Sequence, residues 1–335
     1  MLIQTGIMKK SLTILLLSVM VLTRAWGQDP QFSQFYSSLL YLSPAFAGSK
    51  GGDRLVMNMR DQWLKLPGTY MTGAVSYDHY FPAFKSGVGV LLFQDMAGGG
   101  LLNTTNAGLM YSFMFEVTPI WQIRTGLQFY YTTRGLNFNK LTFNDQLSRD
   151  YIKPSSIEIL ENQRIGHFDF TSSAMAFSEY FWFGVTVDHM MSYSPVLKNE
   201  MGYLPIRYST FAGARYLIAR NTLQKLEESV SLSAHFMIQD KYKYLDMGAH
   251  YLKERLVFGL WFRGLPIFKN NPNAGAISLL GGYKFDMLSI GYSYDFSMSK
   301  LITKTGGAHE VSVSYSLFPD NKRHRRMKMV PCPDF

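Results

Sequence analysis

Residues that could carry acid–base, nucleophilic or metal chemistry are scattered along this chain rather than gathered into motifs. The seven histidines lie between His79 and His324, and none has a second histidine or a carboxylate at metal-ligand spacing. The pair His309-Glu310 continues as Val-Ser-Val, so the two-histidine helix of zinc proteases is absent. Neither a nucleophile elbow nor a phosphate-binding loop occurs. We therefore predict a non-enzymatic protein with no cofactor and no bound metal.

Positive charge is concentrated near the C-terminal end. Residues 319–335 contain two aspartates and five cations, which are Lys322, Arg323, Arg325, Arg326 and Lys328. No aromatic residues that could stack on bases alternate with these cations, which argues against a nucleic-acid partner. The single cysteine, Cys332, excludes an intramolecular disulfide bond. We interpret 319–335 as a basic tail.

The composition narrows the class of protein. Apolar residues make up 47% of the 335 residues and charged residues only 17%, below the ~25% of soluble domains. The mean hydropathy of −0.04 is nevertheless too polar for a bundle of membrane helices. A chain rich in aromatics and glycine with near-neutral hydropathy is typical of a β-barrel that faces lipid on one side and polar surroundings on the other.

We interpret residues 1–27 as an export signal. Lys9-Lys10 precedes an apolar run over 12–22, and the small residues Ala25 and Gly27 offer a cleavage site before Gln28. The alternative is a transmembrane anchor, but the run has about 11 residues, whereas a spanning helix needs about 20. The exported chain is then free to reach the outer membrane.

The rest of the chain alternates between apolar and polar residues with period two, as strands with two different faces do. The pattern is clearest over 228–239, 254–265, 287–297 and 309–317. On this pattern His167, His235 and His250 join solvated polar faces. Asp61, Asp78, Asp169, Asp246 and Asp295 are interpreted as charges of the lumen or rim. A soluble sandwich would alternate as well.

The number and spacing of strands favour the membrane barrel. Most predicted strands are long enough to cross a membrane with tilt. The loops after odd-numbered strands are mostly long, and those after even-numbered strands are mostly short, with 220–227 as the exception. We therefore predict an all-β outer-membrane barrel of about fourteen antiparallel strands over 54–318. The strands are expected near 54–62, 70–80, 86–96, 104–117, 120–134, 167–177, 180–191, 205–219, 228–239, 243–252, 254–265, 275–285, 287–297 and 309–317.

Aromatic residues near strand ends support girdles at the two membrane interfaces. These are Trp63, Tyr80, Phe81, Phe84, Trp121, Tyr180, Phe181, Trp182, Trp261 and Phe318. Residues 28–53 show no clean period, so they either fold into the lumen or lie across the periplasmic mouth.

Three stretches of sequence resemble the PorP/SprF family. Gln28-Asp-Pro-Gln-Phe-Ser-Gln-Phe-Tyr36 and Tyr41-Leu-Ser-Pro-Ala-Phe-Ala-Gly48 resemble the start of that family, and Arg60-Asp61-Gln62-Trp63 extends the match. The resemblance implies an outer-membrane protein of Bacteroidetes tied to type IX secretion and, in gliding members, to delivery of large surface adhesins. It also implies that 28–48 is a docking or plug element. The partner-binding residues expected there are Pro30, Gln31, Phe32, Gln34, Phe35, Tyr36, Pro44 and Phe46.

The basic tail offers a second contact, or only a solvated end. In the functional interpretation Arg323, Arg325, Arg326 and Lys328 meet an acidic face on a periplasmic subunit, while Pro331-Cys332-Pro333-Asp334-Phe335 docks through its aromatic end. The expected partners are outer-membrane lipid, secretion-system subunits and a cell-surface adhesin. An outer-membrane pore or a transporter of hydrophobic substrates is the alternative, and an outer-membrane hydrolase is disfavoured by the missing nucleophile.

Overall fold

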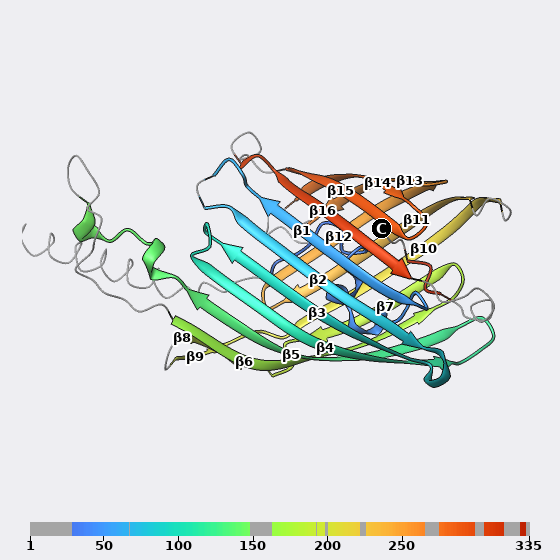
Figure 1. Ribbon diagram of the computed structural model, residues 1–335, viewed down its shortest axis with the longest axis horizontal. Coiled ribbons are helices and arrows are strands. Elements are labelled where there is room, and N and C mark those ends of the chain that lie inside the picture. Colours follow the sequence, from blue (N-terminus) through green and yellow to red (C-terminus); the bar gives the residue numbers. More distant parts are fainter. Residues whose placement is uncertain are drawn as a thin grey trace, which may run out of the picture.

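The computed structural model of the protein describes residues 29–66, 68–147, 163–191, 193–197, 200–221, 226–264, 275–298, 305–317 and 329–332. Within them, fourteen antiparallel strands close into one barrel in which β1 pairs with β16 (Figure 1). The barrel strands are β1 (Asp53–Gln62), β2 (Tyr70–Phe81), β3 (Ser86–Ala97), β4 (Leu102–Glu116), β5 (Gln122–Leu136), β6 (Gln163–Phe177), β7 (Phe181–Asp188), β10 (Arg207–Asn221), β11 (Leu226–Gln239), β12 (Tyr242–Lys253), β13 (Leu256–Arg263), β14 (Ala276–Lys284), β15 (Leu288–Ser297) and β16 (Ala308–Leu317). The predicted fourteen-stranded barrel is confirmed.

Successive residues of a barrel strand point in turn to the inside and the outside of the wall, so buried and exposed side chains alternate along it. Along β1, Arg54, Val56 and Asn58 point inward and are buried, whereas Leu55 and Met57 point outward and are about half exposed. Exposed apolar side chains on the outside suit contact with lipid tails, and closure of the barrel pairs the strand backbones with one another.

Connections of different length gather at the two ends of the barrel. At one end, called here the short-turn end, no connection is longer than 117–121, and the predicted exception at 220–227 shrinks to 222–225. This end contains η2 (Pro82–Phe84). Outer-membrane barrels place their short turns in the periplasm.

The opposite end, called here the long-loop end, contains further small elements. The predicted loop 192–204 contains a hairpin of β8 (Tyr193–Leu197) and β9 (Glu200–Tyr203), and 137–147 contains η3 (Phe138–Lys140) and η4 (Asn144–Gln146). Two connections at this end, 98–101 and 240–241, are short.

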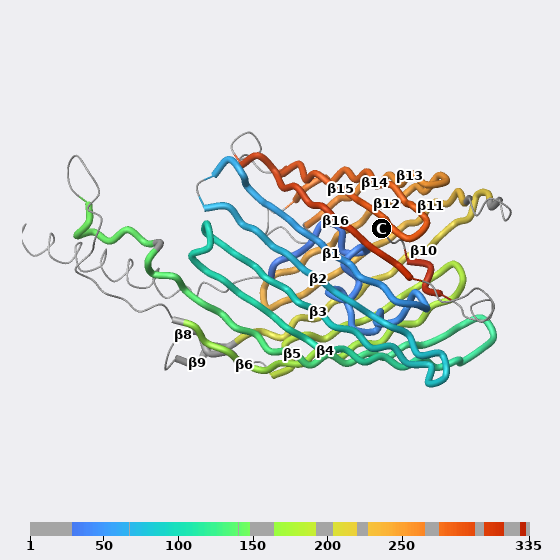
Figure 2. The backbone as a smooth tube through the Cα atoms, viewed as in Figure 1, coloured from blue at the N-terminus to red at the C-terminus, as the bar shows by residue number. Residues whose placement is uncertain are grey.

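Residues 29–52 lie inside the barrel and are called here the luminal segment. Their backbone runs within the ring of strands, drawn in blue in Figure 2, and folds into α2 (Leu39–Leu42) and η1 (Pro44–Phe46). Buried side chains of this segment and inward side chains of the strands form the core. The prediction left two places open for this stretch, and the structure has it in the lumen.

No helix in the described residues is long and apolar enough to cross a membrane. The predicted export signal, 1–27, lies outside the described residues.

Candidate functional site

The luminal segment and the inward side chains around it form the candidate site. Residues 32–40 and 42–52 are buried. A segment enclosed by barrel wall has no solvent face, which explains why its sequence shows no period. Its middle turns sharply at η1, where the Ser43 hydroxyl accepts a hydrogen bond from the amide of Ala45.

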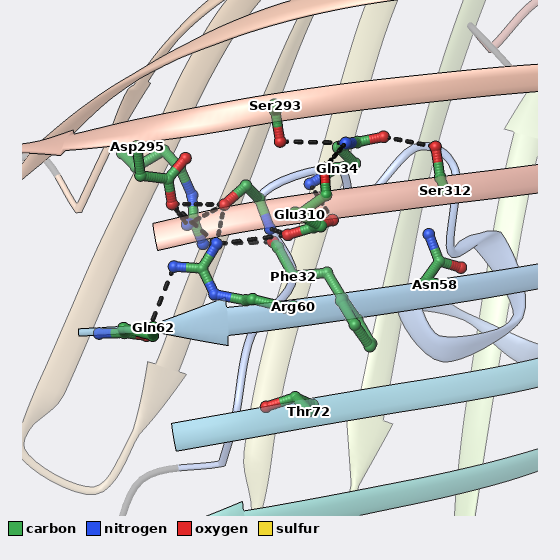
Figure 3. A network of polar contacts seen from close by, with 12 residues as sticks. Phe32, Gln34, Asn58, Arg60, Gln62, Thr72, Ser293, Asp295, Glu310 and Ser312 are labelled. Atoms are coloured by element: carbon green, nitrogen blue, oxygen red, sulfur yellow. Dashed lines mark hydrogen bonds and ion pairs between the residues drawn. The ribbon is translucent and has the colours of Figure 1, made fainter. Parts of the chain in front are cut away.

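A cluster of buried charges on β1, β13, β15 and β16 forms the first anchor (Figure 3). Arg60 Nη1 lies 2.8 Å from Asp295 Oδ2 and 3.3 Å from Glu310 Oε2. Arg263 Nη1 lies 2.8 Å from the same Asp295 oxygen. Two guanidinium groups thus face two carboxylates away from water, so each charge is compensated.

The luminal segment binds directly to this cluster. The backbone amides of Ser33 and Gln34 donate to the two carboxylate oxygens of Glu310, at 2.6 and 2.9 Å. The Gln34 side chain donates to the Ser293 hydroxyl at 3.0 Å and accepts from the Ser312 hydroxyl at 2.6 Å. Ser293 lies on β15 and Ser312 on β16, and Figure 3 shows the Gln34 side chain between them. A donor and an acceptor together therefore fix the position of Gln34.

A second anchor holds the start of the segment at the long-loop end. Asp29 Oδ2 accepts hydrogen bonds from His189 Nε2 at 2.8 Å, Arg207 Nη1 at 3.1 Å and Gln239 Nε2 at 3.1 Å. His189 Nδ1 lies 2.9 Å from Asp169 Oδ2, so both ring nitrogens face carboxylates. Burial alone would lower the pKa of His189, but these carboxylates raise that pKa to about 10. Burial likewise opposes the charge of Asp29, yet His189 and Arg207 hold the Asp29 pKa below its usual value.

A third anchor lies at the short-turn end. The Gly48 amide donates to Asp78 Oδ2 at 2.7 Å, and Arg54 grips both oxygens of the same carboxylate at 2.8 and 3.1 Å. The segment approaches the wall so closely here that two strand positions require glycine. A Cβ at Gly87 would lie 2.1 Å from the Ala47 oxygen. A Cβ at Gly126 would lie 2.3 Å from the Ala45 nitrogen, so both wall positions are shaped to the segment.

Aromatic rings fill the space between the anchors. Tyr36 stacks on Trp261 with ring centroids 5.4 Å apart, and Trp261 Nε1 donates to His250 Nε2 at 3.2 Å. The prediction that Trp261, Trp182 and Tyr80 belong to membrane girdles is wrong, because all three are buried. Their side chains pack with the luminal segment, which offers aromatic surface inside the barrel.

Part of the C-terminal end also lies among the luminal residues. Val330 and Cys332 are buried in the same cluster as Tyr36 and Trp261. Lys50 Nζ donates to the backbone oxygen of Cys332 at 3.3 Å. Cys332 was predicted as one of the partner-binding residues, and in the structure its side chain lies buried among the luminal residues.

The predicted partner-binding residues separate into two groups. Those of the luminal segment come together inside the barrel, six of them buried and two half-buried: Phe32, Gln34, Phe35, Tyr36, Pro44 and Phe46, with Pro30 and Gln31. Those of the tail lie outside the described residues: Arg323, Arg325, Arg326, Lys328 and Phe335.

The sequence analysis missed the wall residues that hold the segment. Arg60, Arg263, Glu310, His189 and Arg207 were not singled out for this role, and the inward aspartates and histidines were expected to be solvated. Most are buried instead, because the lumen is filled. Charged residues at inward positions of predicted membrane strands were the available signal, since buried charges require partners.

The polar groups of this arrangement bind the luminal segment. The carboxylates and guanidinium groups of the first two anchors pair with each other or with the luminal segment. Within the part of the chain that the structure describes, no three His, Cys, Asp or Glu side chains converge as metal ligands. The site therefore holds a polypeptide segment in place.

Comparison with protein families gives one match that covers most of the chain. The model of the type IX secretion system membrane protein PorP/SprF matches residues 25–315. A comparison with curated proteins gives no match.

Several solved structures resemble this chain at low sequence identity. The Ralstonia pickettii toluene transporter TbuX is 10% identical, covering 84% of this chain and 94% of its own, with a TM-score of 0.49. The CymD monoaromatic hydrocarbon channel is 14% identical over 85% of this chain and 94% of its own, with a TM-score of 0.49. Acinetobacter baumannii Omp33 is 10% identical over 79% of this chain and 98% of its own, with a TM-score of 0.45.

Proposed function

Because the chain belongs to the PorP/SprF family of type IX secretion system membrane proteins, we propose that it is a non-enzymatic outer-membrane component of that machinery. In this role it binds machinery subunits or a secreted surface protein and transforms no substrate. The observation that carries the proposal is the luminal segment, which three anchors tie to the wall from the long-loop end to the short-turn end.

The filled lumen argues against the alternative of a pore or a hydrophobic-substrate transporter. A conducting barrel needs a continuous polar channel, and a transporter of apolar ligands needs an apolar cavity with room for them. Here the inward charges Arg60, Asp295 and Glu310 are buried, and backbone amides of the N-terminal segment bind Glu310. The barrel acts as a scaffold that presents its ends to partners.

Partner contact then falls to parts of the chain outside the lumen. Strand β16 ends at Leu317 at the short-turn end, so the basic stretch after it starts on the periplasmic side of an outer-membrane barrel. We assign the contact to Arg323, Arg325, Arg326 and Lys328. An acidic periplasmic subunit is the matching partner, and the charges set the rate and salt dependence of association.

Co-purification from native outer membranes tests the assignment. A variant with Arg323, Arg325 and Arg326 changed to Gln should insert normally but recover the periplasmic subunits several-fold less well than the wild type. The matched control changes Lys85, Lys253 and Arg255 to Gln, which removes three exposed cations from the same end of the barrel.

Two results distinguish the possible errors. Equal partner recovery by both triple variants would show that the tail cations are not the contact. Two results together would contradict the proposed function itself. The wild-type protein would recover no secretion subunit, and cells that lack the gene would still secrete normally.

A further inference from the structure

Three hydrogen-bond donors of the wall converge on one carboxylate oxygen at the long-loop end of the lumen. His189 Nε2, Arg207 Nη1 and Gln239 Nε2 lie 2.8, 3.1 and 3.1 Å from Asp29 Oδ2. His189 directly follows β7, Arg207 begins β10 and Gln239 ends β11. Strand β10 pairs with both β7 and β11, and Arg207 lies opposite Gln239 in that register. The pairing of the wall therefore brings together these three side chains, called here the donor cluster.

The two cations of the donor cluster each have a second carboxylate on the wall. Arg207 donates to Asp188 Oδ2 from Nε at 3.0 Å and from Nη2 at 2.9 Å. His189 Nδ1 lies 2.9 Å from Asp169 Oδ2. The wall itself thus orients and compensates both cations, so the donors are held in place whichever carboxylate lies before them. Asp29 is an added occupant of this preorganised group.

Gln239 indicates that the cluster is built to hold an acceptor. Its side chain is buried, and its Oε1 has no hydrogen-bond partner among the described residues, whereas its Nε2 donates to Asp29. A buried acceptor without a partner costs free energy. The amide suits this position because its donor faces a carboxylate.

The backbone at His189 also departs from the ordinary. Its φ of 58° lies in the left-handed region, which residues with a side chain rarely adopt. Such conformations cluster at binding sites, where they aim a side chain. Here the turn after β7 places the imidazole between Asp29 and Asp169.

The donor cluster is the anchor of the luminal segment that solvent reaches. The side chains of Asp29, His189 and Arg207 are 16%, 12% and 11% exposed. The carboxylates of the other two anchors are closed off, with Glu310 at 0% and Asp78 at 1%. A ligand that arrives from the long-loop end therefore meets this anchor first.

We propose that His189, Arg207 and Gln239 form a carboxylate-binding site at the long-loop end of the lumen, which Asp29 occupies in the free protein. Its ligand is a carboxylate that arrives from outside the barrel and takes the place of Asp29. Charge-assisted hydrogen bonds from imidazolium and guanidinium recognise that group. The exchange replaces one anion by another, so the charge of the site is unchanged, and it detaches the start of the luminal segment from the wall.

Two sources share this chemistry, an acidic side chain of a second polypeptide and a small free carboxylate. Asp29 is tethered to the site, so its effective concentration there is high. A polypeptide can add contacts that outweigh this advantage, whereas a small carboxylate has the donor cluster alone. The site lies at the opposite end of the barrel from the tail contact, so the inference goes beyond the proposed function and does not depend on it.

Chemical rescue of Asp29→Ala tests the site. The substitution removes a carboxylate group, which sodium formate supplies in free form, and formamide is the neutral analogue of formate. Thermal unfolding of the purified full-length protein in detergent is measured near neutral pH, with sodium chloride adjusted to hold the ionic strength constant. The control is Asp286→Ala, which removes a carboxylate that is 90% exposed at the short-turn end.

The midpoint of Asp29→Ala should lie below that of the wild type, and formate should recover at least half of the loss while formamide recovers none. Asp286→Ala should not respond. Adding Gln239→Met to Asp29→Ala removes one neutral donor, so several-fold more formate should be needed for the same rise. If Asp29→Ala does not assemble, formate but not formamide should restore assembly during refolding, read from the mobility of unheated samples on a gel.

The wild type distinguishes the two sources. A midpoint that formate leaves unchanged assigns the exchange to a polypeptide, and a midpoint that formate raises assigns it to small carboxylates as well. The proposal is overturned if formate and formamide act alike on Asp29→Ala. It is equally overturned if Asp286→Ala gains as much from formate as Asp29→Ala does, which would indicate an adventitious ion only.

Discussion

Individual side chains hold the luminal segment, and removing Arg60 should lower the unfolding free energy most. Arg60→Met leaves Asp295 and Glu310 with fewer counter-charges in a buried cluster. Breaking one partner of a buried charge network destabilises by about 3–5 kcal/mol. Urea unfolding in detergent micelles, followed by tryptophan fluorescence, measures the change in unfolding free energy.

The control for Arg60 is Lys85→Met. Lys85 pairs with Glu116 at 3.0 Å, but both side chains are at least half exposed, so the loss should stay below about 1 kcal/mol. Equal losses in the two variants would mean that the Arg60 cluster is open to water and anchors nothing.

The His189 anchor predicts a particular dependence on pH. Its folded pKa of about 10 lies above the value near 6.5 of a free imidazole. A raised pKa stabilises the folded state fully below pH of about 6.5, and the contribution is lost as pH rises through about 10. The unfolding midpoint of the wild type should therefore fall between pH 7 and 10 more steeply than that of His189→Gln. Parallel curves would exclude a charged His189 between Asp29 and Asp169.

At the residue scale, the sequence alone predicted only some of the residues of the candidate site. Motif resemblance singled out Gln34, Phe35 and Tyr36 as partner-binding residues, but it could not say which side chains they contact inside the barrel. Arg60 and Glu310 are 250 residues apart, and only strand register brings them together. Burial of the inward charges depends on the segment that fills the lumen, and no local pattern shows that filling.

At the scale of elements, the close approach of the luminal segment to β5 gives a sharp test. Gly126→Ala places a Cβ against the backbone of Ala45, whereas Gly281→Ala adds the same methyl where nothing lies within 4 Å. The first variant should displace the segment and expose Lys50, which is buried in the wild type. Trypsin should then cut after Lys50 at least ten-fold faster in Gly126→Ala than in wild type or Gly281→Ala.

Equal protection of Lys50 in all three proteins would show that the segment tolerates the added methyl and is not tightly fitted. The mobility of unheated samples on a gel shows whether Gly126→Ala still assembles the barrel. If it does not, faster cleavage after Lys50 would report misfolding and not displacement of the luminal segment. In that case Gly87→Ala, which meets the Ala47 oxygen, is the replacement.

Strands were predictable and the irregular elements were not. Period-two alternation is imposed by the wall itself, which has lipid on one side and protein on the other, so it identified all fourteen barrel strands. The hairpin β8–β9 was expected as loop, and α2 and η1 are too short to show a helical period.

At the scale of the whole molecule, strand pairing closes the barrel, and the chain's own N-terminal residues lie inside it. The luminal segment starts at the long-loop end, where Asp29 is anchored, and reaches the short-turn end before β1 begins. Residues near the other end of the chain, Val330 and Cys332, pack against it. This arrangement suits a secretion component that presents surfaces to partners and keeps the outer membrane sealed.

Single-channel recording in planar bilayers tests this central account most directly. Wild-type protein, inserted at a density confirmed by gel, should show no steady conductance. A variant that lacks residues 29–50 but retains every barrel strand should open stable channels, because the filling is then gone. Large, steady conductance from the wild type would contradict a sealed barrel and favour the pore.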